Sequence, residues 1–130
     1  MQVGVWVALS QATLENGCLW VLPGSHKGPI RRHLPDRRPA ANRAYMEIID
    51  QDDTARVPCL PEPGDVLFFH SYLMHMLTDN VAQERRTTMV YHYAHAGARA
   101  ESPKAAEAIS EVNRWILVRR RGRSAEEGGV

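Results

Sequence analysis

Three polar residues in the second half of the chain, His70, His75 and Arg86, could do chemistry together. Imidazole nitrogens suit Fe(II) and other transition metals. A planar guanidinium holds a carboxylate through two parallel hydrogen bonds, which a lysine cannot reproduce. The residue types therefore allow a metal site beside a carboxylate-binding site, while a histidine at the end of a strand is also a common polar residue of the surface.

The sequence around the histidines predicts a turn followed by a strand. Residues 63–65, Pro-Gly-Asp, have turn chemistry, and residues 66–69 have the β-branched and aromatic content of a short buried strand. His70 and His75 are an odd number of residues apart, so on one continuous strand they would point to opposite faces. Only one of them would then reach the interior, unless the chain turns at residues 71–72.

Two more strands are expected near the N-terminus and one after Arg86. Residues 3–9 are apolar on both faces, as in a strand that is covered on either side. Asn16-Gly17 favours a tight turn with positive φ, which makes residues 18–22 a returning strand. In the third strand, residues 86–94, alternation places His92 on the face of Arg86, where it would contact substrate or fill space.

Two blocks of this sequence resemble the phytanoyl-CoA dioxygenase family, whose members are Fe(II)- and 2-oxoglutarate-dependent hydroxylases. The blocks are VWVALSQATLENGCLWVLPGSHKG and GDVLFFHSYLMH, the second followed by Asn80 and Arg86, and together they cover most of residues 3–94. The resemblance implies that His75 binds Fe(II) and that Arg86 binds the far carboxylate of the cosubstrate 2-oxoglutarate. It also implies that Trp6, otherwise an ordinary core aromatic, lines the cosubstrate pocket. His70 receives no metal role.

The fold that the resemblance implies is mainly β, a double-stranded β-helix of the jelly-roll, cupin-like kind. We expect residues 1–100 to form this core without its first strands, and residues 101–130 to form a C-terminal helix and a disordered tail. Residues 29–56 are polar and predict a long loop, either a substrate-selecting lid or a solvated insertion. A barrel that lacks strands has exposed edges, which predicts self-association.

One motif of the family is missing. Such oxygenases hold iron with two histidines and one carboxylate, and the resemblance places two of these ligands in an H-x-D motif upstream of residues 3–9. None of the six histidines here begins H-x-D, and Leu77 stands where relatives often have a hydroxyl residue that contacts 2-oxoglutarate. We therefore expect the C-terminal part of a dioxygenase, with no catalytic residue assigned. The alternatives are a non-catalytic cupin-like binding module and an inactive remnant.

Composition limits the partners. A chain of 130 residues with a net charge of +1 is of single-domain length and gives no electrostatic argument for nucleic acid or membrane binding, so a small-molecule substrate is expected. The apolar run at residues 3–9 is too short for a signal peptide or a membrane span, which predicts a cytoplasmic protein. Cys18 and Cys59 are predicted to be buried thiols. The arginines at 119–123 are expected in a frayed terminus.

Overall fold

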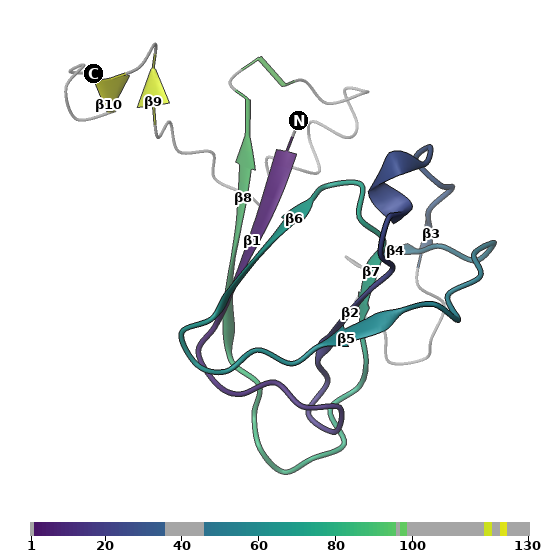
Figure 1. The fold of residues 1–130 in the computed structure, drawn as a ribbon, viewed down its shortest axis with the longest axis vertical. Coiled ribbons are helices and arrows are strands. Elements are labelled where there is room, and N and C mark those ends of the chain that lie inside the picture. Colours follow the sequence, from purple (N-terminus) through teal and green to yellow (C-terminus); the bar gives the residue numbers. More distant parts are fainter. Residues whose placement is uncertain (1, 36–45, 96, 99–118, 121–122, 125–130) are drawn as a thin grey trace. The chain divides into compact units, whose positions relative to one another are not determined.

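The computed structural model describes residues 2–35, 46–95, 97–98, 119–120 and 123–124 (Figure 1). The chain divides into two compact units, residues 2–93 and residues 94–130 together with residue 1. Within the described residues the secondary structure consists of strands and one 3₁₀ helix. All three candidate residues, Trp6, His75 and Arg86, lie in the first unit, so the fold of that unit positions the site.

The first sheet of this unit is built around the N-terminal strand. β1 (Gln2–Ala8) lies between β6 (Val66–His70) and β8 (Thr88–Ala94). β1 and β6 are antiparallel, with Val3 opposite His70 and Val7 opposite Val66. A strand with a neighbour on each side has its backbone groups paired on both edges. Val5 and Trp6, which point to opposite faces of β1, are 8% and 4% exposed, so the middle of this strand is buried on both faces.

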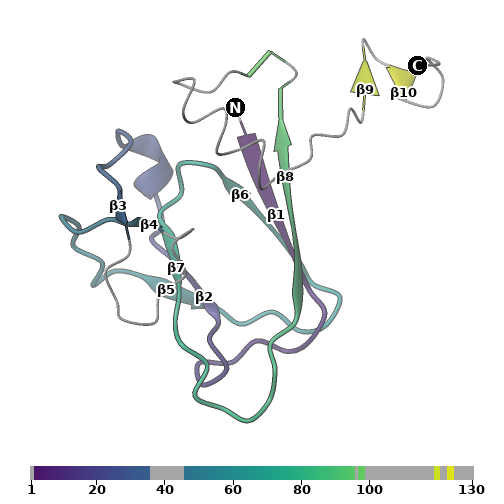
Figure 2. The ribbon, with the colours of Figure 1, turned by 180° about the vertical axis from the view of Figure 1, so that it is seen from behind.

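The second sheet has three very short strands. β2 (Leu19–Val21) lies between β5 (Val57–Cys59) and β7 (His75–Leu77), and both pairings are antiparallel. Figures 1 and 2 show this sheet on the opposite side of the unit from β1, β6 and β8. The sequence predicted β2 but not β5 or β7, because three residues are too few to show a period of two.

The core lies on one face of the first sheet. Gly4 is opposite Phe69 and Trp6 is opposite Leu67, so these four positions share a face. A Cβ on Gly4 would lie 2.5 Å from atoms of the Phe69 ring, so only glycine leaves room for that ring. The buried cluster and the apolar residues packed against it are Trp6, Ala8, Ala12, Cys18 and Phe69, with Trp20, Leu67 and Leu73.

The predicted turns at Gly17 and Gly64 are confirmed. Gly17 has φ 84° and Gly64 has φ 97°, values that favour glycine. Gly17 is also packed closely, because a Cβ there would lie 2.6 Å from the Thr78 carbonyl oxygen. Asn16 is 5% exposed, and its side chain closes the loop by accepting from the Thr13 N–H at 2.8 Å and donating to the Gln11 carbonyl at 2.9 Å.

The remaining described elements are small. The 3₁₀ helix η1 (Ser25–Lys27) follows β2, and β3 (Leu34–Pro35) pairs with β4 (Met46–Glu47) inside the segment predicted as a loop. In the second unit, β9 (Arg119–Arg120) pairs with β10 (Arg123–Ser124), where we expected a frayed terminus. The predicted C-terminal helix lies outside the described residues. The part of the chain that the structure describes contains no apolar helix long enough to cross a membrane.

Candidate functional site

The structure brings Arg86 and Trp6 together. The guanidinium carbon of Arg86 lies 5.6 Å from the centroid of the Trp6 ring, and Trp6 is 4% exposed. A cation over an aromatic face at this distance is attracted by the electron-rich ring. The Nε atom of Arg86 is buried and has no hydrogen-bond partner. A buried donor without an acceptor is costly, so this side chain is suited to a ligand that supplies one.

The loop that leads to Arg86 is tied to the turn near the start of β2. The Glu15 carbonyl accepts from the N–H groups of Val81 and Ala82 at 2.8 and 3.2 Å. The Asn80 side chain accepts from the Ala82 N–H at 2.9 Å and donates to the Glu84 carbonyl at 2.8 Å. The function of Asn80 within this chain is therefore to shape the loop that carries Arg86.

Cys18 belongs to the surroundings of Arg86, which the sequence did not indicate. Its side chain is fully buried. Burial raises the pKa of the Cys18 thiol, and the positive charge of Arg86 partly offsets that increase. Burial also raises the pKa of the half-buried Cys59. Both cysteines are free, as predicted, so a neutral thiol lies within the electrostatic range of the arginine.

His75 is exposed, but its ring lies beside the core that contains Trp6. It is the first residue of β7, and its ring centroid lies 5.0 Å from that of Phe69, which is on the Trp6 face of the first sheet. The Nδ1 atom lies 2.8 Å from the Leu73 carbonyl, so Nδ1 carries the proton and donates it. The lone pair of Nε2 is then available to a metal, an arrangement common among metal-binding histidines.

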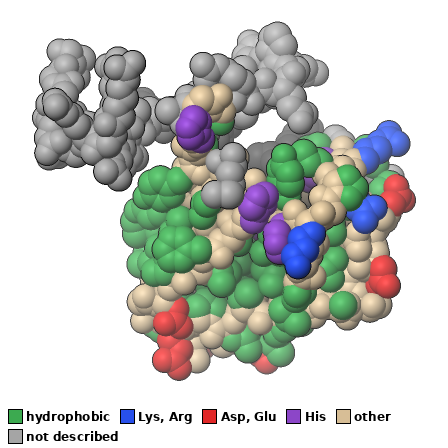
Figure 3. Space-filling model, turned by 45° about the horizontal axis from the view of Figure 1, so that its top comes forward, with side chains coloured by type: hydrophobic (Ala, Val, Ile, Leu, Met, Phe, Trp, Pro, Cys, Tyr) green, Lys and Arg blue, Asp and Glu red, His purple; other side chains and the backbone are tan. Residues whose placement is uncertain are grey.

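His70 is separated from His75 by the predicted turn. Leu73 N–H donates to the His70 carbonyl at 2.9 Å, and the Nδ1 atom of His70 accepts from the Tyr72 N–H at 3.0 Å. The His70 ring lies 5.8 Å from that of His26. Figure 3 shows histidine side chains beside Lys or Arg side chains on this end of the molecule. His70 is therefore a rim residue.

The expectation that His92 faces the interior with Arg86 was wrong. β8 begins at Thr88, after Arg86, and His92 is exposed together with most of the strand. β8 is an edge strand of the described sheet. An edge strand that no second layer covers leaves both faces accessible to solvent, so alternation alone could not place His92.

The described residues do not hold a complete metal site. They contain no group of three or more His, Cys, Asp and Glu side chains arranged around a metal position. Leu77, two residues after His75, offers no ligand atom and is opposite Leu19. Of the residues that the sequence singled out, His75 is the one candidate metal ligand beside the core.

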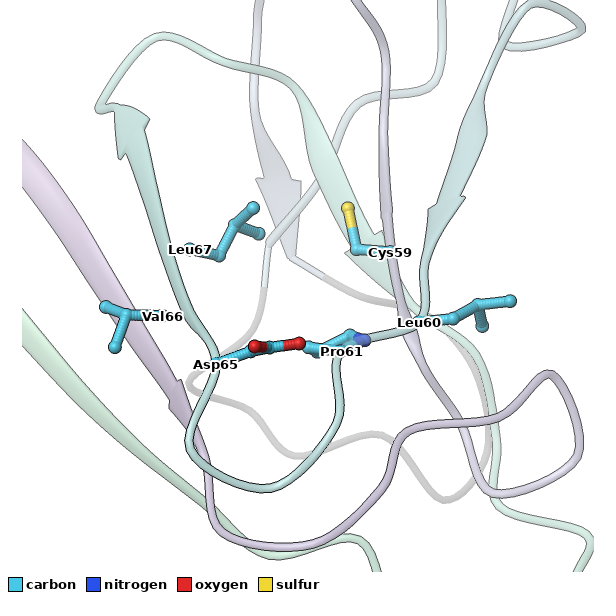
Figure 4. A pocket seen from close by; sticks show the side chains of 6 residues that line it. All are labelled: Cys59, Leu60, Pro61, Asp65, Val66 and Leu67. Carbon is cyan, nitrogen blue, oxygen red and sulfur yellow. The ribbon is translucent and has the colours of Figure 1, made fainter.

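A separate cavity lies between β5 and β6, which are the edge strands on the sides of the two sheets away from β7 and β8. It has a volume of about 330 Å³ (Figure 4), and none of Trp6, His75 and Arg86 lines it. Its one carboxylate, Asp65, already accepts from the Glu62 N–H at 2.9 Å. We do not assign chemistry to this cavity, which is lined by Cys59, Leu60, Pro61, Asp65, Val66 and Leu67.

The arrangement of the two sheets is shared with solved 2-oxoglutarate-dependent enzymes. EvdO2 from Micromonospora carbonacea var. aurantiaca, solved with 2-oxoglutarate, matches with a TM-score of 0.60 at 28% identity over 79% of this chain and 42% of its own. The non-heme α-ketoglutarate-dependent epimerase SnoN from nogalamycin biosynthesis matches with a TM-score of 0.52 at 26% identity over 73% of this chain and 32% of its own. The predicted jelly-roll class is thereby confirmed.

Residues 1–88 match the phytanoyl-CoA dioxygenase (PhyH) family, and the chain belongs to that family of iron- and 2-oxoglutarate-dependent oxygenases. "Phytanoyl-CoA dioxygenase, peroxisomal" of Rattus norvegicus is 38% identical over 78% of this chain and 31% of its own length. "Probable phytanoyl-CoA dioxygenase" of Caenorhabditis elegans is 41% identical over 68% of this chain and 29% of its own. The chain thus spans less than a third of these relatives.

Proposed function

We propose that this chain carries the cosubstrate-binding half of an Fe(II)/2-oxoglutarate-dependent dioxygenase of the phytanoyl-CoA dioxygenase type. Arg86 would bind 2-oxoglutarate, Trp6 would line its pocket, and His75 would bind Fe(II). The substrate that is hydroxylated would be a small molecule. The observation that carries the proposal is the buried Arg86 Nε atom, which has no hydrogen-bond partner and belongs to a half-buried side chain beside the ring of Trp6.

Arg86 and Trp6 fit a dicarboxylate. A carboxylate is the ligand that a guanidinium binds best, through two charge-assisted hydrogen bonds. The Trp6 ring and the neutral Cys18 thiol make the surroundings largely apolar. A low local dielectric strengthens such an ion pair relative to the same pair in water. Bound 2-oxoglutarate would also give the Arg86 Nε–H the acceptor that it lacks within the described protein.

The residues present do not fit a complete iron site. The sequence contains no H-x-D, and His75, beside the Phe69 ring, would supply one ligand. Two histidines and a carboxylate are needed, with open positions for the cosubstrate and oxygen. In a complete enzyme of this class, iron would activate O2, of which one oxygen atom would enter the substrate C–H bond and the other would convert 2-oxoglutarate to succinate and CO2. We derive no step through iron for the 130 residues alone.

The order of the strands supports the addition of a further segment of protein beside the proposed site. Among the described strands, β7 and β8 are each at the edge of their sheet. His75 lies on β7 and Arg86 directly precedes β8. An edge strand has unpaired backbone groups that can bind a further strand. A strand that pairs with β7 would place its side chains next to His75, where the other two ligands are needed.

A second candidate function is a non-catalytic module that binds a carboxylate. Two observations favour this candidate. The Arg86 Nε atom is buried without a partner, and the described residues include no cluster of metal ligands. Both candidates predict 2-oxoglutarate binding, so they differ in turnover once a full ligand set is supplied.

Anaerobic calorimetry with Fe(II) or Mn(II) and with 2-oxoglutarate tests the proposal. We expect the 130-residue chain to bind metal weakly, because one neutral imidazole cannot hold a labile cation against water. We expect 2-oxoglutarate binding that depends on Arg86. Sub-micromolar one-to-one metal binding would instead show that His70, His92 or a carboxylate completes an unexpected site.

A further inference from the structure

We propose that Ser10 is a positioning residue for Arg86, because its hydroxyl holds the backbone on both sides of the arginine. The inference rests on the proposed function, in which Arg86 binds 2-oxoglutarate. It adds a residue that touches neither cosubstrate nor metal and acts through the direction of the Arg86 side chain.

The contacts of Ser10 bracket Arg86. Its Oγ accepts from the Thr87 N–H at 2.8 Å and donates to the Arg85 carbonyl at 3.3 Å. Thr87 also accepts, through its carbonyl, from the N–H groups of Leu9 and Ser10 at 3.0 and 3.3 Å. A hydroxyl can donate and accept at the same time, so one side chain fixes the peptide groups before and after Arg86.

The two hydrogen bonds of the Ser10 hydroxyl replace the backbone support that a regular strand would give Arg86. β8 begins at Thr88, so Arg86 lies outside the strand. β1, which carries Trp6, ends at Ala8, two residues before Ser10. The ring beneath the guanidinium and the hydroxyl that holds the arginine backbone therefore come from the same short segment. Loss of the hydroxyl leaves the two bonds to the Thr87 carbonyl, so the segment should shift rather than unfold.

Ser25 offers a matched control. Its Oγ accepts from the Met74 N–H at 2.8 Å, another bond between distant parts of the chain, but Met74 adjoins His75 rather than Arg86. Removing either hydroxyl deletes the same chemical group and a similar bond. Only the Ser10 change should alter the binding of a carboxylate by Arg86.

The experiment is an NMR titration of the 15N-labelled 130-residue chain with 2-oxoglutarate. For Ser10→Ala we expect a dissociation constant roughly three- to tenfold higher, the effect of losing one ordinary hydrogen-bonding group. Ser10→Thr, which keeps the hydroxyl, should stay close to the parent, and so should Ser25→Ala. Amide exchange should become faster at Thr87 in Ser10→Ala and at Met74 in Ser25→Ala, which reports where each change acts.

A second ligand separates positioning from general loosening. 2-Oxobutyrate lacks the far carboxylate that Arg86 binds in the proposed function, so its binding should depend on Arg86 much less, and Arg86→Lys checks this. Ser10→Ala should therefore weaken 2-oxoglutarate more than 2-oxobutyrate, while a structural role would weaken both equally. If Ser10→Ala does not fold, Ser10→Cys keeps the volume without a strong hydrogen-bonding group and carries the same expectation.

The outcomes distinguish this inference from the proposed function. If Arg86→Lys weakens 2-oxoglutarate but Ser10→Ala does not, while Thr87 exchange is faster, Ser10 has no positioning role and Arg86 keeps its function. If Arg86→Lys has no effect, or the parent chain does not bind 2-oxoglutarate, the proposed function fails and the role of Ser10 fails with it.

Discussion

The region around Arg86 and the region around His75 are organised very differently. Arg86 stacks on a nearly buried tryptophan, and the backbone on both sides of it is bound by the Ser10 hydroxyl. His75 is exposed, lies on an edge strand, and is oriented by one carbonyl and one ring contact. The proposed carboxylate end of the site is therefore held by contacts within the described chain, whereas the proposed metal end lies on an exposed edge strand.

The difference shows which parts of the proposed site this chain provides by itself. An arginine pocket needs one cation, an apolar wall and a supporting backbone, and residues 6–18 and 80–87 supply all three. A metal site of this class needs three ligands, and in the proposed function β7 would contribute one of them, His75. Each prediction below changes either the Arg86 region or the His75 region.

The largest effect is expected when the missing metal ligands are added to the chain. An extended chain, in which a segment with H-x-D from the same gene or a longer relative precedes residue 1, should bind Fe(II) or Mn(II) more than roughly a hundredfold tighter, since even outer-shell groups change metal affinity by 10–100-fold. Succinate formation from 2-oxoglutarate measures whether turnover appears with binding. His75→Ala in the extended chain should abolish both.

Two results would contradict this expectation. Turnover by the 130-residue chain alone would show that it needs no further ligands. An extended chain that binds metal yet forms no succinate, even without a substrate, would favour the carboxylate-binding module.

Replacing Trp6, whose ring lies beside the Arg86 guanidinium, should have the next largest effect. Trp6→Ala should lower the free energy of unfolding by about 3–5 kcal/mol, the usual range for a buried aromatic, because Trp6 is 4% exposed within the main cluster. Chemical denaturation followed by circular dichroism measures this. Met76→Ala, at a position that is 41% exposed, is the control and should cost far less.

Changing the cation itself should affect binding more than folding. Arg86→Lys should weaken 2-oxoglutarate by roughly ten- to a hundredfold, because losing one arm of a charged bidentate pair costs about 1.5–3 kcal/mol. Arg85→Lys, an exposed neighbour with the same chemical change, is the control. Calorimetry in which both variants bind like the parent would remove Arg86 from the site.

The smallest effect concerns the two thiols, Cys18 near Arg86 and Cys59 in the cavity between β5 and β6. Burial holds the pKa of both Cys18 and Cys59 above the ordinary value of 9.0, so both remain protonated at neutral pH. Iodoacetamide should therefore modify the folded chain more slowly than free cysteine at pH 8, and faster as the pH rises above 9. Mass spectrometry should find Cys59 modified first, because Cys18 is fully buried. Equal rates would mean that the Arg86 side opens as readily as the cavity side.

The sequence was sufficient for the long strands and the glycine turns. β1, β6 and the turn at Gly17 follow from local patterns, because apolar runs and a positive φ each leave a clear mark in the residue types. The prediction that β6 is a buried strand was wrong for one face, since Val66 and Phe68 are 45% and 69% exposed. β5 and β7 were missed because strands of three residues are defined by their partners, here β2, rather than by their own sequence.

The site was predictable from the resemblance but not from local patterns. Trp6 and Arg86 are far apart in the sequence, and the structure brings them into contact. His75 was expected to reach the interior, and its contact with Phe69 is consistent with that expectation. The roles of Ser10 and Cys18 could not be predicted, because a hydrogen bond or a charge effect across the fold depends on tertiary packing rather than on residue type.

The position of β1 in its sheet has a consequence for folding speed. β1 begins at Gln2, yet its neighbours are β6, which begins at Val66, and β8, which begins at Thr88. Pairings across such long separations must overcome a large loop-closure entropy and are slow to form. During synthesis β1 emerges first and stays without either neighbour until most of the chain has been made. Its apolar residues are then available to chaperones for longer than those of any later strand in this sheet.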